Sequence, residues 1–269
     1  MNPHRTFFLA LAWVVFICFT PSGVQAAATY VWTSGEDGYW TDPSNWSGNH
    51  IPNGGDDSAW IDGRSTQVTV TIPYTNTQVI DLCGLQVDLG DTLAFQRNQV
   101  IELVKNSGLD PILTNNGEIL LAAAGVNTDK LRANDSTVAI QGSGTIRMGP
   151  GPGNMLEQIN GGSFVHGSEH IIRGRGCLDA PMVNRGSILA DSIDGELIIS
   201  GPMDNSNGAV GAIAEGHVLR LNAPITGGLI DPGDGSIYLN GATLTDTRME
   251  AGNVYLTYQS WLQGSTTLE

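Results

Sequence analysis

The segment NRGSILADSIDGELIISG, residues 184–201, contains two short apolar patterns separated by a glycine. Ile188 and Ala190 lie two positions apart, and so do Leu197 and Ile199. A period of two places each pair on one face of an extended strand, and the segment shows no helical 3.6-residue period. The segment therefore predicts two short β-strands joined by a turn.

The same pattern recurs downstream about every 20 residues. The large residue of the first strand recurs at positions 188, 210, 230 and 249, with separations of 22, 20 and 19 residues. A β-sandwich would instead show tight hairpins without a longer period. We predict an all-β fold, a right-handed single-stranded parallel β-helix over residues 64–269. Its expected core columns are Ile188, Val210, Ile230 and Met249, and Leu197, Leu219, Ile237 and Val254.

Two further patterns extend this interpretation upstream. Residues 138–148 match residues 170–180 at an offset of 32, which predicts equivalent strands separated by an extra loop near residues 149–153. Asn116, Asn184 and Asn205 each precede an expected coil, so we predict a ladder of stacked side-chain amides.

The chain begins with features of an export signal. His4 and Arg5 form a short basic start, thirteen apolar residues follow from Phe7 to Phe19, and small residues end at Ala26. The apolar run is shorter than the roughly 20 residues that a membrane-spanning helix needs. We predict a secretory signal peptide at residues 1–26, a secreted or cell-surface location, and no transmembrane span after cleavage.

A tryptophan-rich segment, residues 27–63, follows the expected signal peptide. It contains Trp32, Trp40, Trp46 and Trp60. The end of a β-helix exposes apolar interior and unpaired strand edges, which proteins usually cover. We predict an N-terminal aromatic cap, and a sugar-stacking platform is the alternative. Only the platform requires accessible ring faces.

The same segment resembles the N-terminal part of secreted bacterial β-helix surface proteins, similar to autotransporter passengers and filamentous-haemagglutinin-like adhesins. The resemblance rests on Trp32, Trp40, Asn45-Trp46, Gly48 and Pro52, followed by Asp56-Asp57 and Ile61, and on the run from Asn184 to Ala190. It implies an exported rod with a structural or adhesive role, often with a C-terminal anchor. The sequence stops just after an apparent coil, so we expect truncation at the C-terminus.

The net charge limits the classes of binding partner, and the cysteine content limits the number of disulfides. The chain has 12 basic and 27 acidic residues, a net charge of −15, which disfavours nucleic acid and anionic membranes. Extracellular polysaccharide and cell-surface components remain as expected partners. Calcium could bind near Asp231 and Asp234, although solvated turns explain these residues more simply. Cys83 and Cys177 alone follow the signal segment, so no disulfide framework is expected.

Catalysis is the main rival to a scaffold role, because pectin-lyase-like solenoids of this fold include polysaccharide lyases and hydrolases. The only local concentration of positive charge is residues 166–175, and its candidate catalytic residues are His170, Arg173 and Arg175. His166, Glu169 and His170 have metal-ligand spacing only on a helix. We expect a non-catalytic structural or adhesive scaffold. The alternative is a carbohydrate-active enzyme or carbohydrate-binding module of the same fold.

Overall fold

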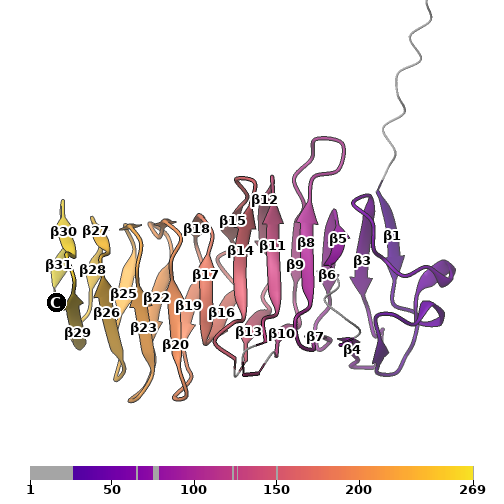
Figure 1. Ribbon diagram of the computed structural model, residues 1–269, viewed down its shortest axis with the longest axis horizontal. Coiled ribbons are helices and arrows are strands. Elements are labelled where there is room, and N and C mark those ends of the chain that lie inside the picture. The colour runs from indigo at the N-terminus through magenta and orange to yellow at the C-terminus, as the bar shows by residue number, and fades with distance from the viewer. Residues whose placement is uncertain are drawn as a thin grey trace, which may run out of the picture.

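The computed structural model describes residues 27–64, 66–74, 79–122, 124–125, 127–149 and 151–268. The expected signal peptide, residues 1–26, lies outside them. The chain winds into an elongated rod of stacked coils (Figure 1). Within the described residues, three sheets of eleven, eleven and nine strands run along the rod, and every strand pair within them is parallel. The expected parallel β-helix is confirmed.

The first sheet has eleven strands. They are β1 (Ala28–Val31), β3 (Asp57–Ile61), β6 (Gly84–Val87), β9 (Ile112–Asn115), β12 (Thr137–Gln141), β15 (Ser163–His166), β18 (Met182–Asn184), β21 (Met203–Asp204), β24 (Ile225–Thr226), β27 (Thr243–Thr245) and β30 (Trp261–Gln263).

The second sheet also has eleven strands. They are β2 (Gly38–Tyr39), β4 (Thr69–Ile72), β7 (Thr92–Phe95), β10 (Glu118–Leu121), β13 (Thr145–Met148), β16 (Ile171–Gly174), β19 (Ser187–Ala190), β22 (Ala209–Ala212), β25 (Leu229–Asp231), β28 (Arg248–Met249) and β31 (Thr267–Leu268).

The third sheet has nine strands. They are β5 (Val79–Leu82), β8 (Val100–Val104), β11 (Lys130–Asn134), β14 (Met155–Ile159), β17 (Gly176–Asp179), β20 (Glu196–Ile199), β23 (Val218–Leu221), β26 (Ser236–Asn240) and β29 (Asn253–Thr257). Each full coil therefore runs from the first sheet to the second and then to the third.

The interior is a set of apolar columns that cross the coils. Ile188 pairs with Val210, Val210 with Ile230, and Ile230 with Met249, and all four side chains are buried. On the third sheet Leu197, Leu219, Ile237 and Val254 pair in the same way. Burial of each such side chain contributes about 1.5–3 kcal/mol. The columns therefore join the coils into one continuous hydrophobic core.

Two details of the repeat differ from the sequence interpretation. The sequence pattern indicated two strands in each coil, whereas the structure adds a further short strand in the first sheet. The sequence did not reveal β18, β21 and β24 because they follow prolines and carry no strand pattern of their own. The match at an offset of 32 residues is also not a structural equivalence. Thr145 pairs with Ile171 in the second sheet, whereas Val138 pairs with Phe164 in the first.

The tryptophan-rich segment is hydrogen-bonded to the coils below it. Strand β1 pairs with β3, and β2 pairs with β4. Between β2 and β3 lie two short 3-10 helices, η1 (Pro43–Asn45) and η2 (Ser47–Asn49). The side-chain carboxylate of Asp42 caps η1 by accepting a hydrogen bond from the Ser44 amide at 3.0 Å. The segment thus forms a first turn of the rod whose third side is made by these helices.

Candidate functional site

His166 and His170 lie inside the rod, where the chain passes from the first sheet to the second. His166 ends β15 and His170 immediately precedes β16. Both side chains are fully buried. Their ring centroids are 5.1 Å apart with the planes nearly perpendicular. Residues 166–175, the segment with concentrated positive charge in the sequence, therefore hold their two histidines away from solvent.

A directional chain of hydrogen bonds fixes the protons of both rings. The Asn184 side-chain nitrogen donates to the Asn205 side-chain oxygen at 2.7 Å, so its own oxygen must accept from His166 Nδ1 at 2.6 Å. His166 Nε2 then accepts from His170 Nδ1 at 3.0 Å. His170 Nε2 in turn accepts from the Asn115 amide at 2.9 Å. Both imidazoles are neutral in this arrangement, with the proton on Nδ1.

The surroundings of the pair keep it uncharged. Burial lowers the pKa of His166 to about 4, although its hydrogen bond to Asn184 favours the proton. Burial also lowers the pKa of His170 to about 3, with a further contribution from His166. A proton added to His170 Nε2 would face the Asn115 amide hydrogens, so charging the pair breaks the chain.

The two histidines replace residues that other coils carry at the same places. Thr145, Ile171 and Ser187 are in register, so the residues that precede them, Gly144, His170 and Gly186, occupy equivalent positions. His166 pairs with Asn184. At the position of His166 the following coil has Asn184 and the preceding coil has Ile140, and at the position of His170 both neighbouring coils have glycine, so one coil places imidazoles at both positions. Alignment of the coils by register would have shown this exchange.

The predicted amide ladder is present but includes a different upstream asparagine. Asn184 bonds Asn205 directly, and the Asn205 side-chain nitrogen donates to the Leu229 carbonyl at 3.1 Å. The upstream member is Asn115, which is fully buried, not Asn116. The Asn116 side-chain oxygen instead accepts from the Ser143 amide at 3.3 Å, outside the ladder. Strand alternation decides this, because neighbours in sequence face opposite sides of the sheet.

The structure does not bring the candidate catalytic residues together. His170 is interior, whereas Arg173 and Arg175 are partly exposed. Arg173 forms an ion pair with Asp191. Arg175 donates from Nη1 to the Asp194 carbonyl. The arginines therefore bond to the turn of the following coil.

The tryptophans separate into two groups. Trp32, Trp40 and Trp46 are at most 1% exposed and pack edge to face. The Trp46 indole donates to the Trp40 carbonyl at 2.8 Å, and the Trp40 indole donates to the Pro52 carbonyl at 3.1 Å. Trp60 instead lies on the outer face of the first sheet and donates to Asp88 at 3.0 Å. The ring faces of the first three are unavailable for stacking on a sugar.

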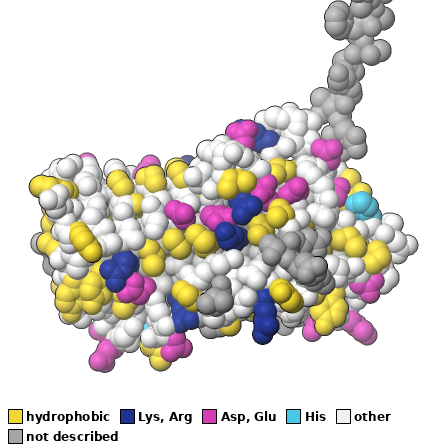
Figure 2. All heavy atoms as spheres, viewed as in Figure 1, with side chains coloured by type: hydrophobic (Ala, Val, Ile, Leu, Met, Phe, Trp, Pro, Cys, Tyr) yellow, Lys and Arg dark blue, Asp and Glu magenta, His cyan; other side chains and the backbone are white. Residues whose placement is uncertain are grey.

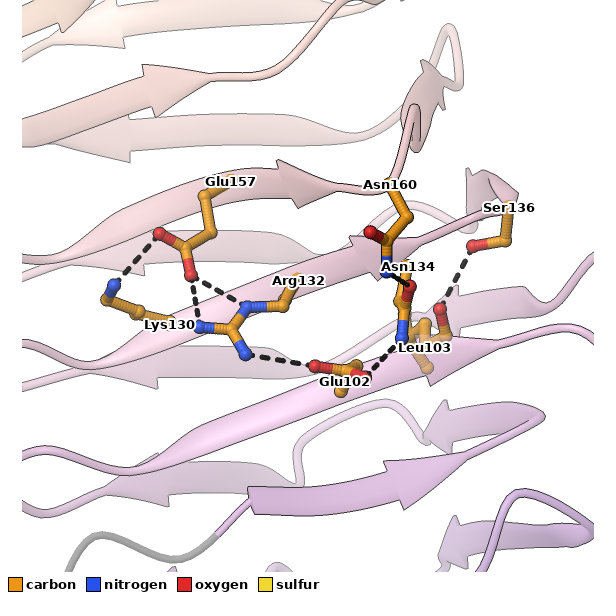
Figure 3. A network of polar contacts seen from close by, with 8 residues as sticks. All are labelled: Glu102, Leu103, Lys130, Arg132, Asn134, Ser136, Glu157 and Asn160. Atoms are coloured by element: carbon orange, nitrogen blue, oxygen red, sulfur yellow. Dashed lines mark hydrogen bonds and ion pairs between the residues drawn. The ribbon is translucent and has the colours of Figure 1, made fainter.

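A ladder of charges on the outer face of the third sheet was not found from the sequence (Figure 3). Arg132 bridges Glu102, at 2.9 Å, and Glu157, at 2.6 Å. Lys130 also contacts Glu157, at 2.9 Å. Asp81 pairs in register with Glu102, and its pKa is raised by burial and then by the Glu102 charge. Two neighbouring carboxylates can serve as an acid and base pair, but here Glu102 is committed to an ion pair with Arg132.

The remaining polar candidates are dispersed. Cys83 and Cys177 are free thiols. The Asp231 side chain accepts from the Gly233 amide at 2.8 Å within its own turn. Among the residues that the structure describes, no group of three or more His, Cys, Asp or Glu side chains could hold a metal ion. Within the same residues, no helix has the length and apolar character needed to cross a membrane.

The chain was compared with protein-family models, with curated proteins and with solved structures, and none of them matches it.

Proposed function

We propose that this protein is a secreted, non-catalytic scaffold of the bacterial cell surface with a structural or adhesive role. The observation that carries the proposal is the unbroken parallel pairing of the coils, from β1 to β30 in the first sheet and from β2 to β31 in the second. Such a rod presents long outer faces whose side chains repeat from coil to coil. The resemblance of the tryptophan-rich segment to adhesin-like β-helix proteins supports the same role.

The bonding of the polar residues also supports a scaffold. The two histidines with the most altered pKa values are sealed in the interior and joined to a structural ladder. Arg132, Arg173 and Arg220 are each paired with carboxylates from neighbouring coils. These groups tie one coil to the next, as expected of side chains with a structural role.

The test uses the native bacterium with the gene deleted and then complemented. We expect loss of surface attachment or envelope integrity on deletion, and full rescue by both the wild type and Arg173→Ala. Fractionation should place the protein outside the cytoplasm. A cytoplasmic protein, or a deletion strain with unchanged attachment and envelope, contradicts the proposal.

A carbohydrate-active enzyme is the second candidate, favoured by the neighbouring carboxylates Asp81 and Glu102 on the outer face of the third sheet. Purified protein incubated with uronate-containing and neutral polysaccharides would reveal it through unsaturated ends or new reducing ends. Turnover abolished by Arg173→Ala or by Asp81→Asn would replace the scaffold proposal with a lyase or a hydrolase, respectively.

A further inference from the structure

The outer face of the first sheet differs from the other two in its charge. Six outward residues in register across the middle of the rod are Ala139, Val165, Val183, Asp204, Thr226 and Thr245. Asp204 is the only charged residue among them. This composition contrasts with the net charge of −15 on the whole chain.

The other faces carry paired charges. On the third sheet Arg132 lies between Glu102 and Glu157, and Arg220 forms a bond to Glu196 at 2.6 Å. Figure 2 shows basic and acidic side chains side by side near the middle of the face in view. On the second sheet Arg147 bonds Glu118 at 2.8 Å. A low charge density is therefore a property of one face and not of the whole rod.

A groove of about 540 Å³ lies on this weakly charged face, crosses β12, β15, β18, β21 and β24, and has Asp204 as the one charged residue among those that line it. The size falls within the roughly 300–1,000 Å³ typical of ligand sites. Four coil steps of about 4.8 Å make it about 19 Å long. Its long axis therefore follows the rod, which suits a polymer better than a compact ligand.

Three exposed prolines form one line along the groove. Met182 pairs with Met203, and Met203 pairs with Ile225, so the residues that precede them, Pro181, Pro202 and Pro224, stack in register. The Pro202 carbonyl accepts a hydrogen bond from the Met182 amide at 3.0 Å, and the Pro224 carbonyl accepts from the Met203 amide at 2.9 Å. Backbone pairing thus fixes a line of apolar rings at the coil repeat.

Hydroxyl groups accompany these rings. Thr137, Ser163 and Thr226 line the groove, and the first two hydroxyl groups lie 3.1 Å apart. No Lys or Arg lines it. A polyanion would find no cation there and would be repelled by the acidic chain. An extended peptide would leave its backbone unpaired, because the strands under the groove already use their own amides and carbonyls in the ladders.

We propose that this groove binds a neutral polysaccharide chain along the rod axis, with C–H faces of the sugars on the prolines and sugar hydroxyls bonded to Thr and Ser. The inference rests on the proposed adhesive function and names the class of its ligand. Val183 lies beside the proline line in the middle of the groove, with its side chain outward and partly exposed.

The test is affinity electrophoresis of the purified full chain in gels that contain soluble glucan, mannan, galactan or xylan, with polygalacturonate as the acidic probe. Val183→Arg introduces charge and bulk into the groove. Ile171→Arg is the matched control, since Ile171 faces outward on the second sheet. Circular dichroism melting of each variant verifies folding.

We expect retardation by at least one neutral polymer, at least tenfold weaker binding by Val183→Arg, and unchanged binding by Ile171→Arg. Retention by polygalacturonate alone, retention by none of the neutral polymers, or equal loss in both variants overturns the assignment. So does Val183-dependent binding of an extended peptide library in place of the glycans. This assay contains no cells, so its result is independent of the deletion experiment. Groove binding can persist when the adhesive role fails, and the adhesive role can hold when groove binding is absent.

Discussion

His170 reaches past one entire coil to bond Asn115, with 2.9 Å between its Nε2 and the amide nitrogen. The coil between them passes through Gly142 and Gly144. A Cβ at Gly142 would lie 2.3 Å from the Asn115 carbonyl oxygen, and Gly142 has a φ of +95°. The absence of a side chain at Gly142 therefore lets this coil pass close to the backbone of Asn115, the residue whose amide bonds His170.

This arrangement predicts loss of stability in acid. Both folded-state pKa values, about 4 and about 3, lie below the unfolded value of 6.5. The unfolded chain therefore binds protons first, and stability is complete above about pH 6.5 and falls as the pH drops below it. At pH 5 the loss is on the order of 2 kcal/mol per histidine. The measurement is the thermal midpoint between pH 4 and pH 8.

The matched variant for this prediction is His166→Asn with His170→Gly, which introduces the residue types that the following coil has at Asn184 and Gly186. Its thermal midpoint should depend less on pH between 4 and 6.5 than that of the wild type. Equal slopes for the two proteins would show that other groups govern the acid response.

Asn184→Leu should destabilise the rod strongly. Asn184 accepts from His166 and from the Gly186 amide, and it donates to Asn205. Each buried group left without a partner costs about 1–3 kcal/mol, so we expect a total loss of at least about 3 kcal/mol. Asn116→Leu is the control, because Asn116 lies outside the ladder, and it should cost below about 1 kcal/mol. Denaturant unfolding measures the free energy of unfolding of both variants. Similar losses in the two would show that the amide ladder does not stabilise the rod.

The repeat could be predicted from the sequence because its interior columns consist of large apolar residues at nearly constant spacing. The short strands that follow Pro181, Pro202 and Pro224 could not, because two or three residues show no alternation. The interior position of His170 was also missed. Polar residues near turns usually face solvent, and only the register shows that this one takes the place of a glycine.

The aromatic cap predicts the response of fluorescence to a soluble quencher. In a protein of residues 27–269 with Trp60→Phe and Trp261→Phe, the tryptophans are Trp32, Trp40 and Trp46, all buried. Acrylamide should quench this variant weakly compared with the wild type, in which Trp261 is 58% exposed. Strong quenching of the variant would mean that the three rings are accessible, as a sugar platform requires.

Arg132→Met should cost more stability than the same change at Arg147. The Arg132 side chain is 18% exposed between carboxylates that are 11% and 12% exposed, whereas Arg147 is 45% exposed beside Glu118. Removing one partner of a buried ion pair leaves unpaired charge and costs about 3–5 kcal/mol, and we expect about 2 kcal/mol for this half-buried network. An exposed pair contributes about 0–1 kcal/mol, the loss expected for Arg147→Met. Urea unfolding at two salt concentrations compares them, and equal losses would show that burial does not strengthen the Arg132 ladder.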